Sequence, residues 1–209
     1  MNKLGSGLSL PPRISGRQLK AEIMWGDENG GSPRFPETVQ AITIRKYSND
    51  PIPLQAFKTS FRNAMERIWI VDEYFLVPDN GPKWDSRITT ILSWVTNELV
   101  ASDIRILTKE HREITPKMLE RFQIKAKEIN EYQTRRERLC TIQVNTRLTQ
   151  CFGFIHDRFA IVDDELWHFG ATVGGFHTSV NAASRGWSAE DSGAIAFFQM
   201  AWDKCKESK

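Results

Sequence analysis

Several features are scarce in this chain of 209 residues, and each scarcity argues against a class of protein. The three cysteines, Cys140, Cys151 and Cys205, are an odd number without Cys-x-x-Cys spacing, which argues against a disulfide framework and a thiolate zinc site. No apolar run approaches the length that spans a bilayer, and the first residues lack the pattern of a secretion signal. We therefore expect a soluble, cytoplasmic protein in a reducing compartment, without a membrane partner.

A strong excess of charge is also missing. The 28 basic and 26 acidic residues leave a formal charge of +2, which is too mild to indicate nucleic-acid binding without local clustering of cations. An apolar content of 40% suits one globular domain plus an extension. Composition divides the chain into three parts: a Gly-, Ser- and Pro-rich flexible arm (1–18), an N-terminal β extension packed on the main domain (19–53), and the main α/β domain (54–209).

Hydrophobic periodicity predicts alternating helices and strands after residue 53. In the extension, the alternation over 19–25 and 38–47 predicts an antiparallel hairpin at a sheet edge. Apolar stripes at helical spacing predict helices over 54–65, 88–99, 116–138 and 196–206, and short apolar runs predict strands over 67–71, 103–107, 141–144, 154–162 and 166–172. A strand, helix and strand in succession require a parallel pair. We expect an α/β fold with a mixed, largely parallel sheet and helices on both faces.

The sharpest chemical signal is the run Cys151–Asp164, which contains His156, Arg158 and Asp163. Side chains alternate along a strand, so His156 and Arg158 should project to the same side and meet one phosphate together. Asp163 has the opposite parity, and we expect it to hold the following turn rather than to touch substrate. Taken alone, His156 is more simply a half-buried strand histidine with a structural hydrogen bond. The complete spacing favours an inherited motif instead.

This His-x-Arg-x4-Asp spacing, followed by Gly170-Ala-Thr172 and by the acidic residues Glu190 and Asp191, resembles the signature of the phospholipase D-like superfamily. The resemblance is firm over about residues 150–202, and it covers only the order of elements from residue 54. It is closest to the small bacterial nucleases of the family, which carry one motif copy. Such relatives occur in restriction, plasmid and phage-defence settings, where other subunits of such a system are partners.

The resemblance implies a metal-independent phosphodiesterase, most simply a nuclease, that needs no cofactor. One histidine attacks phosphorus to form a phosphohistidine, and a second protonates the leaving oxygen. Because the chain has a single motif copy, the resemblance implies a homodimer with His156 opposite its own copy. Arg158 would grip the phosphate, Thr172 and Asp191 would contact the substrate, and Glu190 would orient the imidazole.

Three departures from the family pattern support an alternative function. Arg158 stands where active members mostly carry Lys, and Arg is a rigid fork rather than a mobile point charge. Ala171 and Val173 replace a hydroxyl and an amide that usually line the pocket. The alternative is a catalytically silent module of the same fold that binds nucleic acid or phosphate ligands, or that scaffolds a larger complex.

A basic segment offers a route for a nucleic-acid backbone. Arg135, Arg136 and Arg147 could form a cationic track, since each neutralised phosphate adds affinity. The alternative is a solvated helix face, because glutamates are interleaved with these cations and can pair with them locally. Both interpretations stay open at the level of sequence. Of the other histidines, His168 alternates with two aromatic residues, which favours interior packing.

Overall fold

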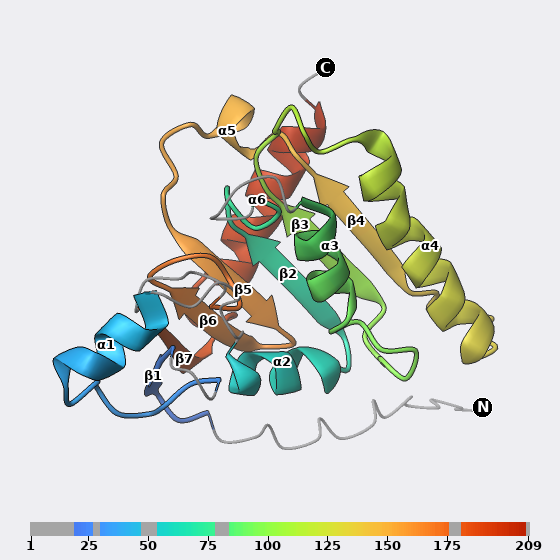
Figure 1. Cartoon of the computed structure of the whole chain (residues 1–209). Helices are drawn as coiled ribbons and strands as arrows, with labels where there is room; N and C mark the ends of the chain where they lie inside the picture. Colours follow the sequence, from blue (N-terminus) through green and yellow to red (C-terminus); the bar gives the residue numbers. More distant parts are fainter. Residues whose placement is uncertain (1–18, 27–29, 47–53, 78–83, 176–180, 208–209) are drawn as a thin grey trace, which may run out of the picture.

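A computed structural model describes residues 19–26, 30–46, 54–77, 84–175 and 181–207 (Figure 1). In this part of the chain, seven strands form one open sheet in the order β1-β7-β6-β5-β2-β3-β4. The strands are β1 (Glu22–Trp25), β2 (Arg67–Val71), β3 (Asp103–Leu107), β4 (Thr141–Asn145), β5 (Arg158–Val162), β6 (Glu165–Phe169) and β7 (Ala182–Ser188). The predicted arm at 1–18 lies outside the described residues.

The sheet is mixed, but the expectation of a largely parallel sheet is wrong. Strands β2, β3 and β4 are parallel, and every other neighbouring pair in the described sheet is antiparallel. Parallel pairs need long crossovers, and helices supply these only between β2 and β4. From β5 onward, no helix of the described residues separates one strand from the next, and the two-residue turn of Asp163 and Asp164 makes β5 and β6 a hairpin.

Helices cover both faces of this sheet, as the periodicity predicted. The described helices are α1 (Val39–Lys46), α2 (Gln55–Arg62), α3 (Trp84–Leu92), α4 (Pro116–Tyr132), α5 (Leu148–Cys151) and α6 (Ala194–Glu207). Figure 1 shows α3 and α4 in front of the sheet and α6 behind it. Among the described residues, no helix combines the length and apolar character that crossing a bilayer demands.

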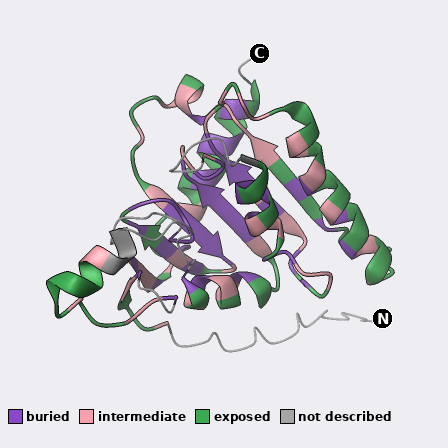
Figure 2. Ribbon diagram, viewed as in Figure 1, coloured by how far each residue is buried: buried purple, intermediate pink, exposed green. Residues whose placement is uncertain are grey.

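Alternation along each strand divides the core into two layers. Ile68 and Ile70 of β2 pack with side chains from α2, α3 and α4, whereas Trp69 and Val71 pack with Phe198 and other residues of α6. The central strands are buried on both sides, while the outward face of α4 is exposed (Figure 2). This sandwich fixes the ends of β2 and β5, which carry the candidate site.

Local signals located most elements correctly. Thr115 caps α4 by accepting a hydrogen bond from the backbone N–H of Met118, and Pro116 occupies the first turn, as predicted. The stripe predicted to continue to residue 99 ends as a helix at Leu92. Val95 and Leu99 are nevertheless buried, because the irregular segment after α3 still packs on the core.

The predicted N-terminal hairpin is wrong. Residues 39–46 form helix α1, and β1 pairs with the distant strand β7 instead. Strand β7 is rich in Ala and Ser and lacks the apolar alternation that identifies a strand, so periodicity could not identify this partner. The edge position expected for residues 22–25 is correct.

Candidate active site

The candidate site lies at one end of the central strands, where several chain segments converge. This row of strand ends, and not an edge strand, is called the edge of the site. Strand β2 is parallel to β3 and antiparallel to β5, so the residues after Val71 lie beside those that precede Phe159. The end of β6 reaches the same edge, because Phe169 pairs with Arg158. Residues Asp72–Tyr74, His156–Arg158 and 170–173 therefore meet at this edge, although they are far apart in sequence.

His156 is the exposed member of the site. Strand β5 begins at Arg158, so His156 lies in the preceding segment and the predicted strand over 154–162 was four residues too long at its start. The His156 side chain is 82% exposed, and its Nδ1 atom lies 3.7 Å from Oε1 of Glu73. The Glu73 carboxylate thus lies beside the imidazole, and the exposure of His156 leaves the ring accessible to a large substrate.

Arg158 instead lies against the buried carboxylate of Asp72. The Arg158 Nε atom is 3.8 Å from Oδ1 of Asp72, whose side chain is completely buried. The guanidinium carbon lies 4.8 Å from the ring centre of Tyr74, and Nζ of Lys109 lies 3.5 Å from that centre. Tyr74 thus carries two cations near its ring, an arrangement that its negative π face favours.

Asp72 is held by backbone donors as well as by charge. Its carboxylate accepts hydrogen bonds of 2.8 Å from the backbone N–H groups of Tyr74 and Val173. Burial is the strongest influence on this group and raises the pKa of Asp72 to about 6, against the opposing effects of the two backbone bonds and of Arg158 and Arg87. Asp72 therefore changes its charge in the mildly acidic range.

His156 and Arg158 do not meet one ligand in the manner expected. His156 lines an open groove of about 650 Å³ on the α6 side of the sheet, whereas Arg158 does not line it. The alternation rule does not apply to His156, because the residue precedes the strand. The two side chains instead contact consecutive residues, Glu73 and Asp72, and so flank the same turn.

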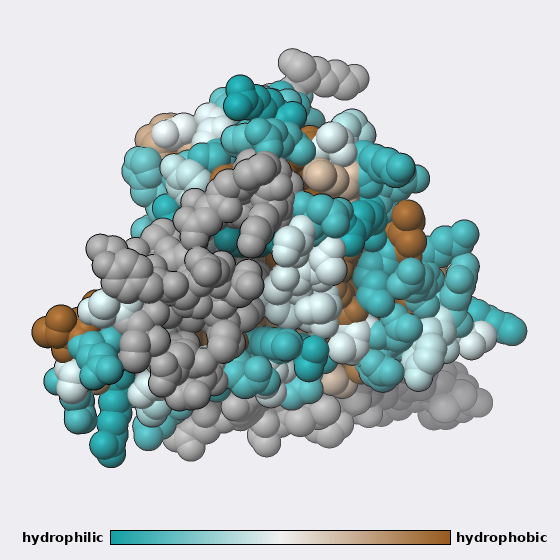
Figure 3. All heavy atoms as spheres, in the orientation of Figure 1, coloured by the Kyte–Doolittle hydropathy of each residue, from teal (hydrophilic) through white to brown (hydrophobic). Residues whose placement is uncertain are grey.

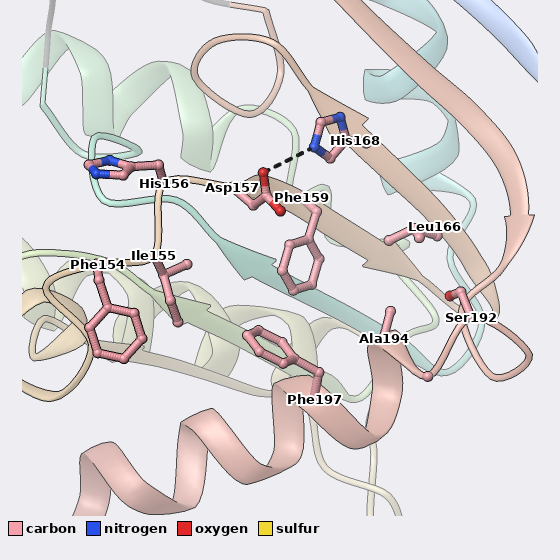
Figure 4. Close-up of a pocket in the computed structure, with 11 residues that line it drawn as sticks. Phe154, Ile155, His156, Asp157, Phe159, Leu166, His168, Ser192, Ala194 and Phe197 are labelled. Atoms are coloured by element: carbon pink, nitrogen blue, oxygen red, sulfur yellow. Dashed lines mark ion pairs between the residues drawn. The ribbon is translucent and has the colours of Figure 1, made fainter.

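The groove contains a second imidazole. Figure 4 shows His168 from β6 at the rim beside Asp157, with Phe159 and Phe197 along the apolar side. The Nε2 atom of His168 lies 3.6 Å from Oδ1 of Asp157, and the His168 side chain is 51% exposed. The expectation that His168 packs in the interior is therefore wrong, because the buried face of β6 carries Trp167 and Phe169.

The segment after β6, residues 170–173, packs beside the site. Thr172 is buried, as are its neighbours Ala171 and Val173. The hydrogen bond from Val173 to Asp72 brings this segment to the same edge as Arg158. Thr172 therefore lies near Arg158 with a buried side chain, and its role in binding phosphate stays a prediction.

Asp163 holds a turn, as we expected from its place in the alternation of side chains along the strand. Its carboxylate accepts hydrogen bonds from the backbone N–H groups of Met65, Glu66 and Arg67, at distances between 2.7 and 3.2 Å. These bonds join the β5–β6 turn to the start of β2. Asp163 lies at the opposite edge of the sheet from His156, which agrees with a structural position rather than with contact to a substrate there.

Glu190 and Asp191 also lie at that opposite edge. The Glu190 backbone N–H donates to Oδ1 of Asp164, and the Asp191 backbone N–H donates to Oγ of Ser188. Asp164 follows β5 and His156 precedes it, so about 15 Å of strand separates them. The structure does not bring Glu190 to the imidazole, and Glu73 occupies the place expected for it.

The three arginines of the predicted track are separated. Arg135 donates to the carbonyl groups of Leu99 and Val100 and is fixed beneath them. Arg136 is exposed near the start of β4. Arg147 lies beyond the other end of β4, where its Nε atom donates to Gln150 over 3.2 Å. The solvated-face alternative suits the adjacent helix α4, where Lys125 pairs with Glu128 and Lys127 pairs with Glu131. Figure 3 shows a mostly hydrophilic surface there.

Sequence reasoning missed the residues that flank the motif in space. Asp72, Glu73 and Tyr74 follow a strand whose position was predicted correctly, and Lys109 follows the next one. Functional side chains often lie at the carboxyl ends of parallel strands, and this rule could have found them. Within the described ranges, no three His, Cys, Asp or Glu side chains gather as a metal site.

Comparisons with known proteins found neither a matching family model nor a matching curated protein. Among solved structures, the archaeal chromatin protein TrmBL2, which is described as showing a novel mode of DNA binding, is similar with a TM-score of 0.41 and 12% identity over 92% of this chain. A phosphatidylserine synthase from Haemophilus influenzae Rd KW20 is similar with a TM-score of 0.39 and 16% identity over 69% of this chain. The chain spans only 55% and 33% of these two proteins.

Proposed function

We propose that this protein is a metal-independent phosphodiesterase that cleaves nucleic acid, with His156 as its nucleophile. The observation that carries the proposal is the exposed His156 imidazole beside Glu73 at the mouth of a groove. A carboxylate near Nδ1 favours the tautomer that carries its proton there, which makes Nε2 the nucleophilic nitrogen. The motif resemblance supplies the class of reaction.

The reaction proceeds in two displacements. The Nε2 lone pair of His156 attacks phosphorus, the bond to the leaving ester oxygen breaks, and a second imidazole donates a proton to that oxygen. Water then attacks the phosphohistidine, the same second imidazole accepts a proton from it, and the P–N bond breaks. The products are an alcohol and a phosphomonoester, and both imidazoles return to their starting states.

The second imidazole comes from His156 of a second copy in a shared dimeric site. A second imidazole from another copy requires a homodimer. We also propose that the protein works in a bacterial defence system. His168 of the same chain is a competing source, since it lines the same groove as His156. Subunit mixing separates the two sources. A shared site loses activity in every mixed dimer, whereas an intrachain site keeps one active centre for each wild-type subunit.

The test is cleavage of single- and double-stranded DNA and RNA in excess EDTA. Cleavage is expected with the wild-type protein and should disappear in His156→Asn. His111→Asn is the matched control, because His111 lies in a loop and accepts a backbone hydrogen bond from Glu113. Recovery of phosphohistidine at residue 156 after rapid quenching supports the mechanism. Undiminished cleavage by purified His156→Asn excludes it.

A second candidate is binding of nucleic acid without cleavage. Its specific support is the position of Arg158, which is engaged with Asp72 and Tyr74 and does not line the groove with His156. This arrangement gives a fixed positive charge but leaves the imidazole without an adjacent guanidinium at the reacting phosphate. The candidate predicts binding that weakens in Arg158→Ala and no product under the conditions above. A phosphohistidine adduct would exclude it.

A further inference from the structure

We infer that the groove beside His156 is a subsite for one unpaired nucleobase and its sugar, so that the preferred ligand is single-stranded nucleic acid. The inference rests on the proposed function, because it places the nucleoside next to the phosphate that His156 contacts. It adds the substrate class and the part of the protein that recognises it.

The apolar side of the groove offers aromatic rings from three separate segments. Phe154 precedes β5 and is 77% exposed, Phe159 lies on β5, and Phe197 projects from α6 and is 37% exposed. The rings of Phe159 and Phe197 are 6.0 Å apart and tilted against each other. Figure 4 shows these side chains along one side of the hollow. The exposed rings of Phe154 and Phe197 provide stacking surface for a base of any identity, whereas Phe159 is buried and contributes only to the wall of the groove.

The opposite rim supplies polar groups. Asp157 and His168 form a pair across 3.6 Å, and Ser192 lies farther along the groove. A carboxylate accepts hydrogen bonds, an imidazole can donate or accept, and a hydroxyl does both. A nucleobase has the complementary structure, with two apolar faces and a polar edge. An acyl chain would make no use of these polar groups.

The size and position of the groove fit the same ligand. Its volume of about 650 Å³ falls within the range of small-molecule sites, which runs from about 300 to 1,000 Å³. His156 is part of its lining, so a nucleoside in the groove would place an adjoining phosphate within reach of the imidazole. The groove is open to solvent rather than enclosed, so a nucleoside that is part of a longer strand can enter it.

A double helix fits this arrangement poorly. Its bases are stacked and paired inside the duplex, so a base would have to leave the stack before its face could reach Phe154 or Phe197. That step has an energetic cost which a single strand does not incur. The geometry therefore favours single-stranded DNA or RNA, and base identity should matter less than the presence of a base.

The test compares two short single-stranded oligomers of equal length and charge, one carrying thymine bases and one fully abasic. Both have phosphorothioate linkages, which slow cleavage, and dissociation constants are measured by fluorescence anisotropy at one salt concentration. We expect the wild-type protein to bind the thymine oligomer at least tenfold more tightly, the scale of one stacked base. Phe154→Ala and Phe197→Ala should each reduce that preference severalfold.

Tyr132→Ala is the matched control, because Tyr132 is an exposed aromatic residue at the end of α4, away from the groove. It should retain the full preference for bases. Equal binding of both oligomers by the wild-type protein overturns the inference. So does conversion of a dimer to a monomer by the two Phe substitutions without change in the base preference, since the groove would then be an interface between copies.

Failure of this inference can be told from failure of the proposed function. Cleavage that depends on His156 but shows no base preference removes the nucleoside subsite and leaves the phosphodiesterase intact. A base preference that depends on Phe154 and Phe197 without any cleavage supports the subsite and excludes the phosphodiesterase. Stronger binding of duplex than of single-stranded DNA of the same length overturns the assigned substrate class.

Discussion

The Nδ1 atom of His156 lies 3.7 Å from the Oε1 atom of Glu73, a residue that is 83 positions earlier in the chain. The Glu73 side chain is only 12% exposed, whereas His156 is 82% exposed. A mostly buried carboxylate thus supports an accessible imidazole. The antiparallel pairing of β2 with β5 creates this contact, because it places the end of one strand beside the start of the other.

Glu73→Gln should lower kcat for nucleic-acid cleavage by about tenfold or more, with little change in KM. Glu73 touches the imidazole rather than the substrate, and its charge stabilises the imidazole in the reacting orientation. Steady-state kinetics in EDTA would measure the effect. Glu110→Gln is the control, since Glu110 is an exposed acid that contacts Gln150. An equal loss in the control, or a change confined to KM, contradicts the assignment.

Asp72 should make the protein less stable as the pH rises through the mildly acidic range. Burial raises the pKa of Asp72 from 3.8 to about 6, so the folded state holds this proton more tightly than the unfolded state. A raised carboxyl pKa favours folding most below pH 4, and this contribution is lost as the pH rises through about 6.

Asp72→Asn keeps the shape and removes the titration. Between pH 4.5 and 7.5, the wild-type protein should lose roughly 2 kcal/mol of unfolding free energy relative to Asp72→Asn. Urea unfolding of both proteins at the two pH values measures this difference. A difference that does not change with pH would mean that the pKa of Asp72 is not raised, and a change of the opposite sign would show that the backbone hydrogen bonds and Arg158 outweigh the burial of the carboxylate.

Asp163→Ala should destabilise the fold by about 2–3 kcal/mol, since several backbone donors lose their one charged acceptor at once. Asp163 also has a positive φ of 57°, a conformation that Asn tolerates better than Ala. Asp163→Asn should therefore be less harmful than Asp163→Ala. Thermal unfolding compares the two. Equal stability of all three proteins would mean that the turn bonds contribute nothing in solution.

Local sequence patterns located most of the elements after residue 53, but not the partners across the sheet. The strand at 67–71 and the cap at Thr115 depend on residues within one or two turns, which periodicity detects. The contact of Glu73 with His156 depends on which strands become neighbours. The sequence showed an acidic residue after the motif, Glu190, and nothing local indicated that the β6–β7 return would place it at the far edge.

Arg135→Ala should reduce stability and leave nucleic-acid affinity nearly unchanged. Its guanidinium donates to main-chain carbonyl groups of the segment that ends near Ala101, so its loss leaves these acceptors without that donor and should cost roughly 2 kcal/mol. Arg136→Ala is the matched comparison, because that side chain is exposed and should affect stability little. Chemical denaturation and oligomer binding on both variants separate the roles. A large loss of affinity in Arg135→Ala at normal stability would restore the cationic track.

Gly186→Ala should detach β1 from the sheet edge. Gly186 has a φ of 96°, and a Cβ atom at this position would lie 2.0 Å from the carbonyl oxygen of Lys20. The overlap is with backbone rather than with a flexible side chain, so β1 must move away from β7. Amide hydrogen exchange should show lost protection in residues 22–25.

Gly193→Ala separates the steric effect from the backbone strain. Gly193 also has a positive φ, of 75°, but a Cβ atom there would have open space around it. This variant should cost only about 1–2 kcal/mol of strain and keep the protection of β1. If Gly186→Ala behaves in the same way as Gly193→Ala, the close approach of β1 to β7 does not persist in solution, and the N-terminal strand is not an integral part of the sheet.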